Sequence, residues 1–410
     1  MAVKVLLATM YWPPAGGGGV PRPLKLATYL PELGIETHVL VPSDSKRMHR
    51  DESLVAPPAA IVHETRNFAP RVHRPQDELA KAHGLERLRL QAALTGRRLL
   101  IPDPSSPWLL TAIPAAIKLV RRHGIDAVIT SSPPGSVNLL GAAVKRATGV
   151  RWVADLRDSL ISHPHRRQDV RGERRVAKLV ARYADGIVCV APAAVEEMKA
   201  LSPRGPVELI DHGADFDDFE GLEYTRADRF RITHTGTIFG RRDPKPFLHA
   251  LARVNGDVVA RFVGDFRDAD RAAIAELGLG EKVELVPYLP RREALALQRD
   301  SDALLLLVPA GEGRGRFVVT TKIFEYLAAG RPILASVPED GAAAELLRET
   351  GAGVVAPPDD VDAIADALSG LVERWRDGSL DAVELAPDVS AGLSRRSRVV
   401  RFAELLRSVQ

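Results

Sequence analysis

The sequence predicts an α/β protein made of two doubly wound domains, and three observations lead to this expectation. Short apolar runs alternate with helix-like segments along nearly the whole chain, which is typical of parallel sheets with crossover helices. The alternation starts afresh after a polar stretch near the middle of the sequence. A chain of 410 residues also exceeds what one compact core holds, and it fits two domains of ordinary size.

The first series opens with a buried strand, because the apolar residues 3–9 lead into a Pro-Pro turn and then into helical spacing from Pro23 to Leu33. The least regular part of the chain follows, from Asp44 to about Pro107. The other strands expected in this half are residues 36–42, 126–130, 151–155 and 186–190.

The boundary between the domains is expected in the stretch from His212 to Arg229, which is rich in Asp and poor in aliphatic residues. We therefore predict domains at 1–210 and 211–393. The tail from Ser394 to Val409 has helical spacing and can pack on either domain. The strands expected in the second series are residues 229–236, 258–264, 282–288, 303–308, 332–336 and 353–357.

Composition favours a soluble, cytoplasmic enzyme. No apolar run reaches the roughly 18 residues that a membrane-spanning helix needs. The chain has one cysteine, Cys189, so an intramolecular disulfide is excluded and a reducing compartment is expected. Because Cys189 lies in an apolar run, we interpret it as a small residue of the core.

The net charge of +3 is too small to indicate a nucleic-acid partner, but its distribution is uneven. The segment from Lys81 to Arg122 carries eight Lys and Arg residues against only Glu86 and Asp103, with leucines between them. Such a segment can lie on an anionic membrane face, or it can be a solvated helix surface. The basic residues are Lys81, Arg87, Arg89, Arg97, Arg98, Lys118, Arg121 and Arg122.

A four-glycine loop follows the first strand, in the run YWPPAGGGGVPR. Glycine allows positive φ and close approach of a ligand to the backbone just before a helix, so a phosphate or a sugar hydroxyl can bind there. The dinucleotide-binding fingerprint does not fit, because Arg22 stands where its third glycine should be. Asp44 after the second strand keeps a dehydrogenase as an alternative, and a purely structural loop is another. The four residues are Gly16, Gly17, Gly18 and Gly19.

Two polar segments follow later strands of the first half, where parallel sheets place their ligands. The first is ITSSPPGSVNLLG and contains Ser132 and Pro133. The second is RWVADLRDSL, in which Asp155 and Asp158 bracket Arg157. This cluster can orient a hydroxyl or stabilise a cationic transition state, and a structural Asp–Arg pair is the alternative.

In the second half, HTGTIFGRRDPKP turns at Gly236 and Gly240 and then presents three cations before a helix, Arg241, Arg242 and Lys245. Cations beside a helix start suit a diphosphate and can balance its charge without a metal ion. The run DFDDF at 215–219 resembles a metal-binding D-x-D motif, but we favour a linker role because no histidine surrounds it.

The segment TTKIFEYLAAGRPILAS places one carboxylate, Glu325, at the start of an amphipathic helix. Backbone N–H groups of the first turn, near Thr321, and the amino group of Lys322 can receive phosphate. A carboxylate one turn later can accept hydrogen bonds from ribose. The preceding loop, with Arg314 and Arg316, is expected to close over this ligand.

Taken together, these segments resemble a retaining glycosyltransferase of the GT-B fold, in family 4, over nearly the whole chain. The resemblance implies two Rossmann-like domains facing across a cleft, with the last helix crossing back onto the first. The first domain would bind a hydroxyl acceptor, and the second would bind a nucleotide-diphosphate sugar. No cofactor and no metal are expected, because in this family the leaving phosphate itself takes the proton of the acceptor in a front-face displacement.

The resemblance also implies roles for individual residues. Gly236, Arg241, Arg242, Lys245, Thr321, Lys322 and Glu325 would bind the donor, with Glu325 on the ribose. Gly16, Gly17, Gly19, Arg22, Ser132, Pro133 and Arg157 would bind the acceptor. Asp155, Asp158 and Gly18 would line the reaction centre. Relatives in polysaccharide assembly suggest a bacterial lipid-linked saccharide at the inner face of the membrane as acceptor, and a soluble natural product is the alternative.

The chain departs from the family pattern at one position. The Glu-x7-Glu pair of the family would place a carboxylate at position 317, where this sequence has Phe317. A noncatalytic nucleotide-binding or scaffold protein therefore stays open as an alternative function. A nucleotide-sugar epimerase or phosphorylase stays open as well, because it shares the same fold.

Overall fold

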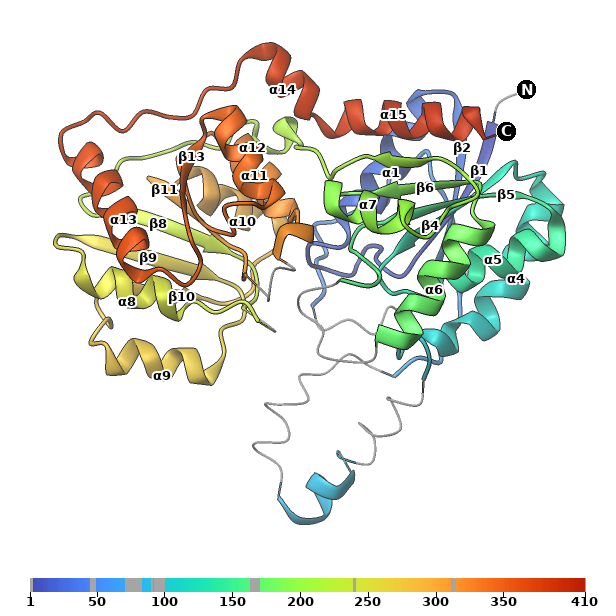
Figure 1. The fold of residues 1–410 in the computed structure, drawn as a ribbon, viewed down its shortest axis with the longest axis horizontal. Coiled ribbons are helices and arrows are strands. Elements are labelled where there is room, and N and C mark those ends of the chain that lie inside the picture. The colour runs from blue at the N-terminus through green and yellow to red at the C-terminus, as the bar shows by residue number, and fades with distance from the viewer. Residues whose placement is uncertain are drawn as a thin grey trace.

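The protein consists of two α/β lobes that lie side by side (Figure 1). The computed structural model describes residues 3–44, 49–70, 83–89, 91, 100–162, 170–238, 241–310 and 315–409. Within these residues the strands form two parallel sheets, one of seven strands and one of six. The predicted fold class of two doubly wound domains is confirmed.

The sheet of the first lobe has the strand order β3-β2-β1-β4-β5-β6-β7. Its inner strand β1 is flanked by parallel neighbours, so that Leu7 pairs with Val39 on one side and Ile129 on the other. All three side chains are fully buried, which explains why these strands are continuous apolar runs. The strands are β1 (Val3–Thr9), β2 (Ile35–Pro42), β3 (Ile61–Thr65), β4 (Ala127–Ser132), β5 (Arg151–Leu156), β6 (Gly186–Cys189) and β7 (Val207–Leu209).

Helices cover both faces of this sheet. Helix α1 packs its Leu26 and Leu30 on one face, and α4 and α5 cover the other face around Trp108. Helices α4 and α5 each end at a glycine in the left-handed conformation, whose backbone N–H caps the last turn. The helices are α1 (Pro21–Glu32), η1 (Ser106–Trp108), α4 (Leu109–His123), α5 (Ser136–Thr148), α6 (Val170–Tyr183) and α7 (Pro192–Lys199).

The sheet of the second lobe has the order β10-β9-β8-β11-β12-β13. Its strands are β8 (Phe230–Thr235), β9 (Val258–Val263), β10 (Val283–Val286), β11 (Ala303–Leu307), β12 (Ile333–Ser336) and β13 (Gly353–Ala356). Its helices are α8 (Lys245–Arg253), α9 (Asp268–Glu276), α10 (Arg291–Arg299), α11 (Thr321–Ala329), α12 (Ala342–Thr350) and α13 (Val361–Arg376). Phe230, Phe247 and Phe262 form much of the core on the α8 and α13 side.

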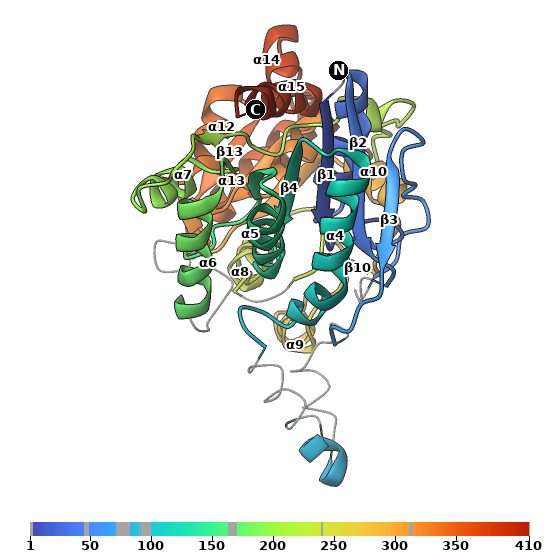
Figure 2. The ribbon, with the colours of Figure 1, turned by 90° about the vertical axis from the view of Figure 1, so that its right-hand side faces the viewer.

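The chain passes between the lobes twice, and the two passages lie next to each other. The first contains η2 (Phe216–Phe219), and the second contains α14 (Pro387–Leu393) and α15 (Arg395–Ser408). Ala214 N–H donates to Leu393 O at 2.8 Å, and Arg395 N–H donates to Ala214 O at 2.8 Å. Helix α15 then packs Phe402 and Leu406 into the core of the first lobe, so both chain ends lie near this lobe (Figure 2).

Two edge strands, β3 and β7, were not predicted. Strand β3 lies in the stretch that we expected to be irregular, and none of its side chains is fully buried, so it lacks the continuous apolar run of a central strand. Strand β7 has only three residues. Edge strands carry a weaker sequence signal because only one neighbour and part of one face constrain them.

Cys189 is a residue of the core, as predicted. It is fully buried and contacts the carbonyl of Ala194. Burial raises the pKa of its thiol to about 12, so the thiolate that would make it reactive is not formed at neutral pH. None of the described helices is both long and apolar enough to cross a membrane.

Three histidines meet on β2, β3 and the end of α4. His38 Nδ1 lies 2.9 Å from His63 Nε2, and the His123 ring lies 4.7 Å from that of His38. His38 Nε2 is also hydrogen-bonded to Glu36 at 2.9 Å. Burial, followed by the charges of the neighbouring imidazoles, lowers the pKa of both His63 and His123.

These lowered pKa values predict a loss of stability in mild acid. Below about pH 6.5 the unfolded chain takes up protons that folded His63 and His123 do not accept, so the free energy of unfolding falls as the pH falls. Thermal unfolding between about pH 7.5 and 5.5 should show this drop, and the variant His63→Gln should show a smaller one. His249→Gln, at an exposed position of the second lobe, is the control. An equal pH dependence in wild type and His63→Gln would contradict the prediction.

Candidate active site between the lobes

Loops at the carboxyl ends of the two sheets contact each other at the junction of the lobes. The glycine loop follows β1, and its backbone lies against Tyr288, which follows β10 in the second lobe. A Cβ atom on Gly16 would stand 2.1 Å from Tyr288 Oη, so a larger residue would force the Tyr288 side chain to move. The φ of Gly17 is +96°, which also favours glycine. A Cβ on Gly18 would be 3.4 Å from Thr321 Oγ1, so the structure brings these two predicted site residues together.

Arg157 joins the glycine loop to the loop after β4. Its guanidinium donates to Gly19 O and, at 2.9 Å, to Pro133 O. Its Nε donates to Ser132 O at 3.2 Å, and the group stacks 4.6 Å from the Tyr11 ring centre. Burial lowers the pKa of Arg157. Four of the predicted acceptor residues therefore form one connected unit, in which Arg157 contacts backbone carbonyls.

Asp155 pairs with Arg22 rather than with its sequence neighbour Arg157. Arg22 Nη2 lies 2.8 Å from Asp155 Oδ1, and both side chains are almost fully buried. Ser131 Oγ donates to the second carboxylate oxygen at 2.8 Å. This pair fastens α1 to β5 beneath the glycine loop. Asp158, two residues after the end of the same strand, is partly exposed. The acceptor and catalytic roles of these residues stay predictions.

Lys322 lies in the first turn of α11, and its side chain reaches the backbone turn at Gly236. Thr320 caps the helix by accepting from Lys322 N–H at 3.0 Å. A Cβ on Gly236, whose φ is +119°, would stand 2.7 Å from Lys322 Nζ. Burial lowers the pKa of Lys322 to about 7, and the nearby charge of Arg242 acts in the same direction.

The three cations predicted after β8 differ in their surroundings. Arg242 is buried and donates to Thr237 O at 3.1 Å and to Leu307 O at 3.3 Å. Burial lowers its pKa to about 10. Arg241 is half-buried, and Lys245 is exposed at the start of α8. Of the predicted cations, Arg242 of this loop and Lys322 of α11 are therefore the two that the structure places close together.

Glu325 lies one turn further along α11 and is held from two sides. Arg291 Nη1 donates to Glu325 Oε1 at 2.6 Å, and Gln298 Nε2 lies 3.4 Å from Oε2. Gln298 is fixed in turn by Thr235 Oγ1 at 2.9 Å. Burial would raise the pKa of Glu325, but the charge and hydrogen bond of Arg291 outweigh it and lower that pKa. The carboxylate is therefore ionised.

Several residues of the junction were not predicted. His49 Nε2 lies 2.6 Å from Asp265 Oδ2 of the other lobe, and its ring stacks on Tyr288 with centres 4.2 Å apart. Asp51 accepts from Arg291 N–H at 2.8 Å. Tyr288 and Arg291 could have been found, because Tyr288 ends the predicted strand 282–288 and Arg291 follows it. His49 and Asp51 lie in the irregular stretch and carry no comparable signal.

Phe317 occupies the position where the family pattern has its first glutamate. It lies in a short 3-10 turn at 315–317 and is partly buried, with the Arg316 guanidinium 5.4 Å from its ring centre. Gly240 and Arg314 lie outside the described residues. Over the part of the chain that is described, no group of three or more His, Cys, Asp or Glu side chains is arranged to hold a metal ion.

Comparison with known proteins identifies two family domains. Residues 17–213 match the glycosyl transferase 4-like domain, and residues 229–374 match the glycosyl transferases group 1 domain. The two matches lie one on each lobe. A search of curated proteins finds no match.

Solved structures with the same architecture cover the whole chain at low sequence identity. Sucrose-phosphate synthase from Thermosynechococcus elongatus is 15% identical over 99% of both chains, with a TM-score of 0.71. HepE from Anabaena, solved with UDP-glucose, is 16% identical over 99% of both chains, with a TM-score of 0.67. The lipopolysaccharide outer core galactosyltransferase WaaB is 13% identical over 100% of both chains, with a TM-score of 0.61.

The domain matches agree with the predicted resemblance, and the two facing sheets agree with the architecture of these enzymes. The chain belongs to the family-4-like glycosyltransferases of the GT-B fold.

Proposed function

We propose that this glycosyltransferase moves a sugar from a nucleotide-diphosphate sugar to a hydroxyl acceptor, with retention of configuration and without a metal ion. The observation that carries the proposal is the first turn and a half of α11. There an ionised carboxylate, Glu325, follows a capped helix start and the amino group of Lys322. A helix start with a cation receives phosphate, and the carboxylate accepts from ribose. HepE, which has the same fold, was solved with UDP-glucose.

The diphosphate is assigned to Lys322, the first backbone N–H groups of α11 near Thr321, and the turn at Gly236. Arg242 lies beside this group and supports it electrostatically. Arg241 and Lys245, which are more exposed than Arg242, are the other candidates for binding the diphosphate. Because these groups supply positive charge where the leaving group gains negative charge, the bond can break without a metal ion or a cofactor.

In the proposed reaction the bond from the anomeric carbon to the phosphate oxygen breaks, and a bond to the acceptor oxygen forms on the same face. The acceptor proton passes to the departing phosphate. The glycine loop, with Gly18 beside Thr321, lines the place where donor and acceptor would meet. Asp158, which is partly exposed, is our candidate for orienting the acceptor hydroxyl, and Asp155 would act indirectly through its pair with Arg22.

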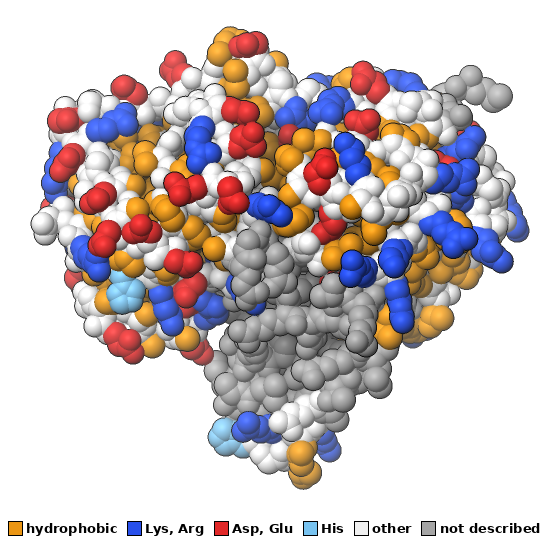
Figure 3. Space-filling model, in the orientation of Figure 1, with side chains coloured by type: hydrophobic (Ala, Val, Ile, Leu, Met, Phe, Trp, Pro, Cys, Tyr) orange, Lys and Arg blue, Asp and Glu red, His pale blue; other side chains and the backbone are white. Residues whose placement is uncertain are grey.

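We propose an amphiphilic, lipid-linked acceptor at the inner face of the plasma membrane. Strand β3 and the loop after it leave the same sheet edge as the glycine loop, and apolar side chains are exposed on this side: Phe68 at 49%, Ile101 at 64% and Leu110 at 72%. Residues 83–89 lie beyond them, at the lower end of the molecule (Figure 1). Figure 3 shows basic and apolar side chains together at this tip. A surface of this kind suits an anionic lipid headgroup layer.

The membrane proposal predicts binding to vesicles. The described residues at the tip include Arg87 and Arg89 with the exposed Leu85 and Leu88, whereas Lys81, Arg97 and Arg98 lie outside the described residues. Wild type should sediment with phosphatidylglycerol vesicles and less with phosphatidylcholine vesicles, and salt should weaken the binding.

The double variant Arg87→Glu, Arg89→Glu should bind more than about tenfold less, since each of the two basic residues near the surface contributes about 1 kcal/mol. The control double variant changes two exposed arginines of the second lobe, Arg271→Glu and Arg374→Glu. Equal sedimentation of both double variants would count against the membrane surface.

The donor site is tested by nucleotide binding. UDP, GDP, ADP, dTDP and their sugar conjugates should give a base-selective rise in Tm that does not depend on magnesium. Glu325→Gln should weaken binding of the selected nucleotide by about 1.5–3 kcal/mol, the worth of hydrogen bonds to a charged group. Glu345→Gln, an exposed change in α12, should not. If no nucleotide raises the Tm, or if Glu325→Gln binds nucleotide as tightly as wild type, the proposed donor site is wrong. Hydrolysis of the donor or transfer of its sugar rules out a scaffold role.

The pKa of Lys322, about 7 in the free protein, predicts proton uptake when a diphosphate binds. The new negative charge raises this pKa, so above about pH 7 binding takes up a proton and the affinity falls as the pH rises. Calorimetry at about pH 8 in two buffers of different ionisation enthalpy should measure uptake in wild type. The uptake should vanish in Lys322→Met and persist in Lys245→Met. Undiminished uptake in Lys322→Met would assign the proton to another group.

A further inference from the structure

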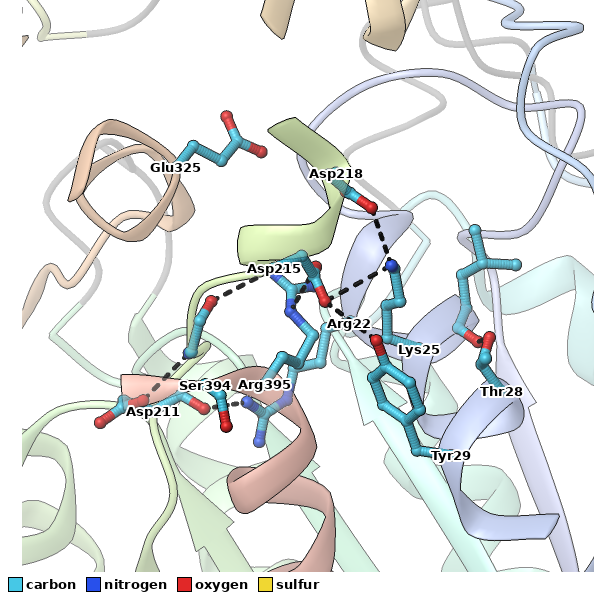
Figure 4. Close-up of polar contacts among 12 residues, drawn as sticks. Arg22, Lys25, Thr28, Tyr29, Asp211, Asp215, Asp218, Glu325, Ser394 and Arg395 are labelled. Atoms are coloured by element: carbon cyan, nitrogen blue, oxygen red, sulfur yellow. Dashed lines mark hydrogen bonds and ion pairs between the residues drawn. The ribbon is translucent and has the colours of Figure 1, made fainter. Parts of the chain in front are cut away.

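A row of four alternating charges runs from the first lobe to the proposed ribose contact. Lys25 of α1 lies 3.0 Å from Asp218 of η2. Asp218 lies 2.9 Å from Arg291 of α10, and Arg291 lies 2.6 Å from Glu325 of α11. Figure 4 shows Lys25, Asp218 and Glu325 around the two passages between the lobes. The row joins three separate elements to the carboxylate.

The two middle groups of the row stabilise each other's charged form. Burial would raise the pKa of Asp218, but Arg291 and Lys25 outweigh it and lower that pKa. Burial would lower the pKa of Arg291, but Glu325 and Asp218 outweigh it and raise that pKa. Arg291 therefore serves two carboxylates at once: Nη1 donates to Glu325, while Nη2 and Nε donate to Asp218.

The backbone of Arg291 is also tied to the first lobe. Its N–H donates to Asp51 at 2.8 Å, close to the contact of Gly16 with Tyr288. The neighbouring Arg292 is different: it is exposed to solvent on one side and donates only to the carbonyls of Asp218 and Glu220, both at 2.9 Å. Arg291 is thus the arginine at this helix start whose side chain reaches Glu325.

Glu325 needs such a partner if it is to receive ribose. A glutamate loses rotamer freedom when it is ordered, and a carboxylate already fixed in place binds a ligand without that entropic cost. Arg291 Nη1 uses part of the hydrogen-bond acceptor capacity of Oε1, while Oε2 accepts a long contact of 3.4 Å from Gln298. Each carboxylate oxygen can accept more than one hydrogen bond, so acceptor capacity remains for a hydroxyl pair.

We propose that Arg291 is a positioning residue for the donor, and that the contact between the lobes sets its position. In this arrangement Lys25 and Asp218 hold Arg291, and Arg291 holds Glu325 in the orientation that accepts the ribose hydroxyls. Nucleotide affinity then depends on a lysine of the first lobe that has no contact with Glu325. The inference rests on the proposed function, which places the donor ribose at Glu325.

The test compares a nucleoside diphosphate with its 2′,3′-dideoxy counterpart. The probes are UDP and 2′,3′-dideoxy-UDP, or the matching GDP or ADP pair if the donor screen selects another base. Wild type should bind the ribose form about tenfold or more tightly, since hydroxyls donating to a carboxylate are strong hydrogen bonds. Glu325→Gln should lose most of this preference.

Three variants then separate positioning from a general structural role. Arg291→Gln should lose the preference nearly as completely as Glu325→Gln, while its affinity for the dideoxy form stays close to that of wild type. Lys25→Met, which keeps the apolar stem, should lose part of the preference. Arg292→Gln, the matched control, should keep it. Because Lys25→Met changes a partly exposed residue, it tests the inference even if Arg291→Gln does not fold.

The outcomes are distinguishable. If Glu325→Gln loses the preference for ribose but Arg291→Gln and Lys25→Met keep it, the donor site stands and the positioning role of Arg291 is wrong. If Glu325→Gln itself keeps the wild-type preference, the ribose assignment in the proposed function is wrong, and the inference falls with it.

Discussion

Buried pairs of opposite charge at the junction of the lobes are the interaction on which the site depends. Arg395 and Asp215 lie 3.0 Å apart, and Arg22 and Asp155 lie 2.8 Å apart, with all four side chains almost fully buried. Such a pair adds little stability compared with an apolar pair of the same volume, but removing one partner costs about 3–5 kcal/mol. The charges therefore act mainly to specify one arrangement, in which α1, β5, the interlobe segment and α15 meet.

The second constraint is the close approach of backbones at this junction. Gly16 leaves room for Tyr288, and Gly236 leaves room for the end of Lys322, in both cases where a Cβ would overlap the neighbour. The glycines weaken the local backbone because they are costly to order. In the proposed function that cost is offset, because these loops would bring main-chain N–H groups near donor and acceptor.

Fold and family followed from patterns that are local in the sequence. The apolar runs that became β1, β2, β4 and β5 are buried on both faces of a parallel sheet, so their composition is decided by their surroundings. The helix that carries Glu325 could be predicted equally well from the sequence, since Thr320 caps it and a glycine ends it. Strands β3 and β7 could not be predicted from the sequence, because their residues lie at the sheet edges and none is fully buried.

The partners within the site were decided by tertiary structure. Arg22 meets Asp155, which lies 133 positions away in the chain, although Arg157 stands only two residues from that carboxylate. Asp51 meets the backbone of Arg291 across 240 positions. By itself the sequence determined the secondary structure of the main strands, the two-lobed class and the family. The pairing of charges depended on which strand ends the folded sheets bring together, because long side chains reach several partners and burial selects among them.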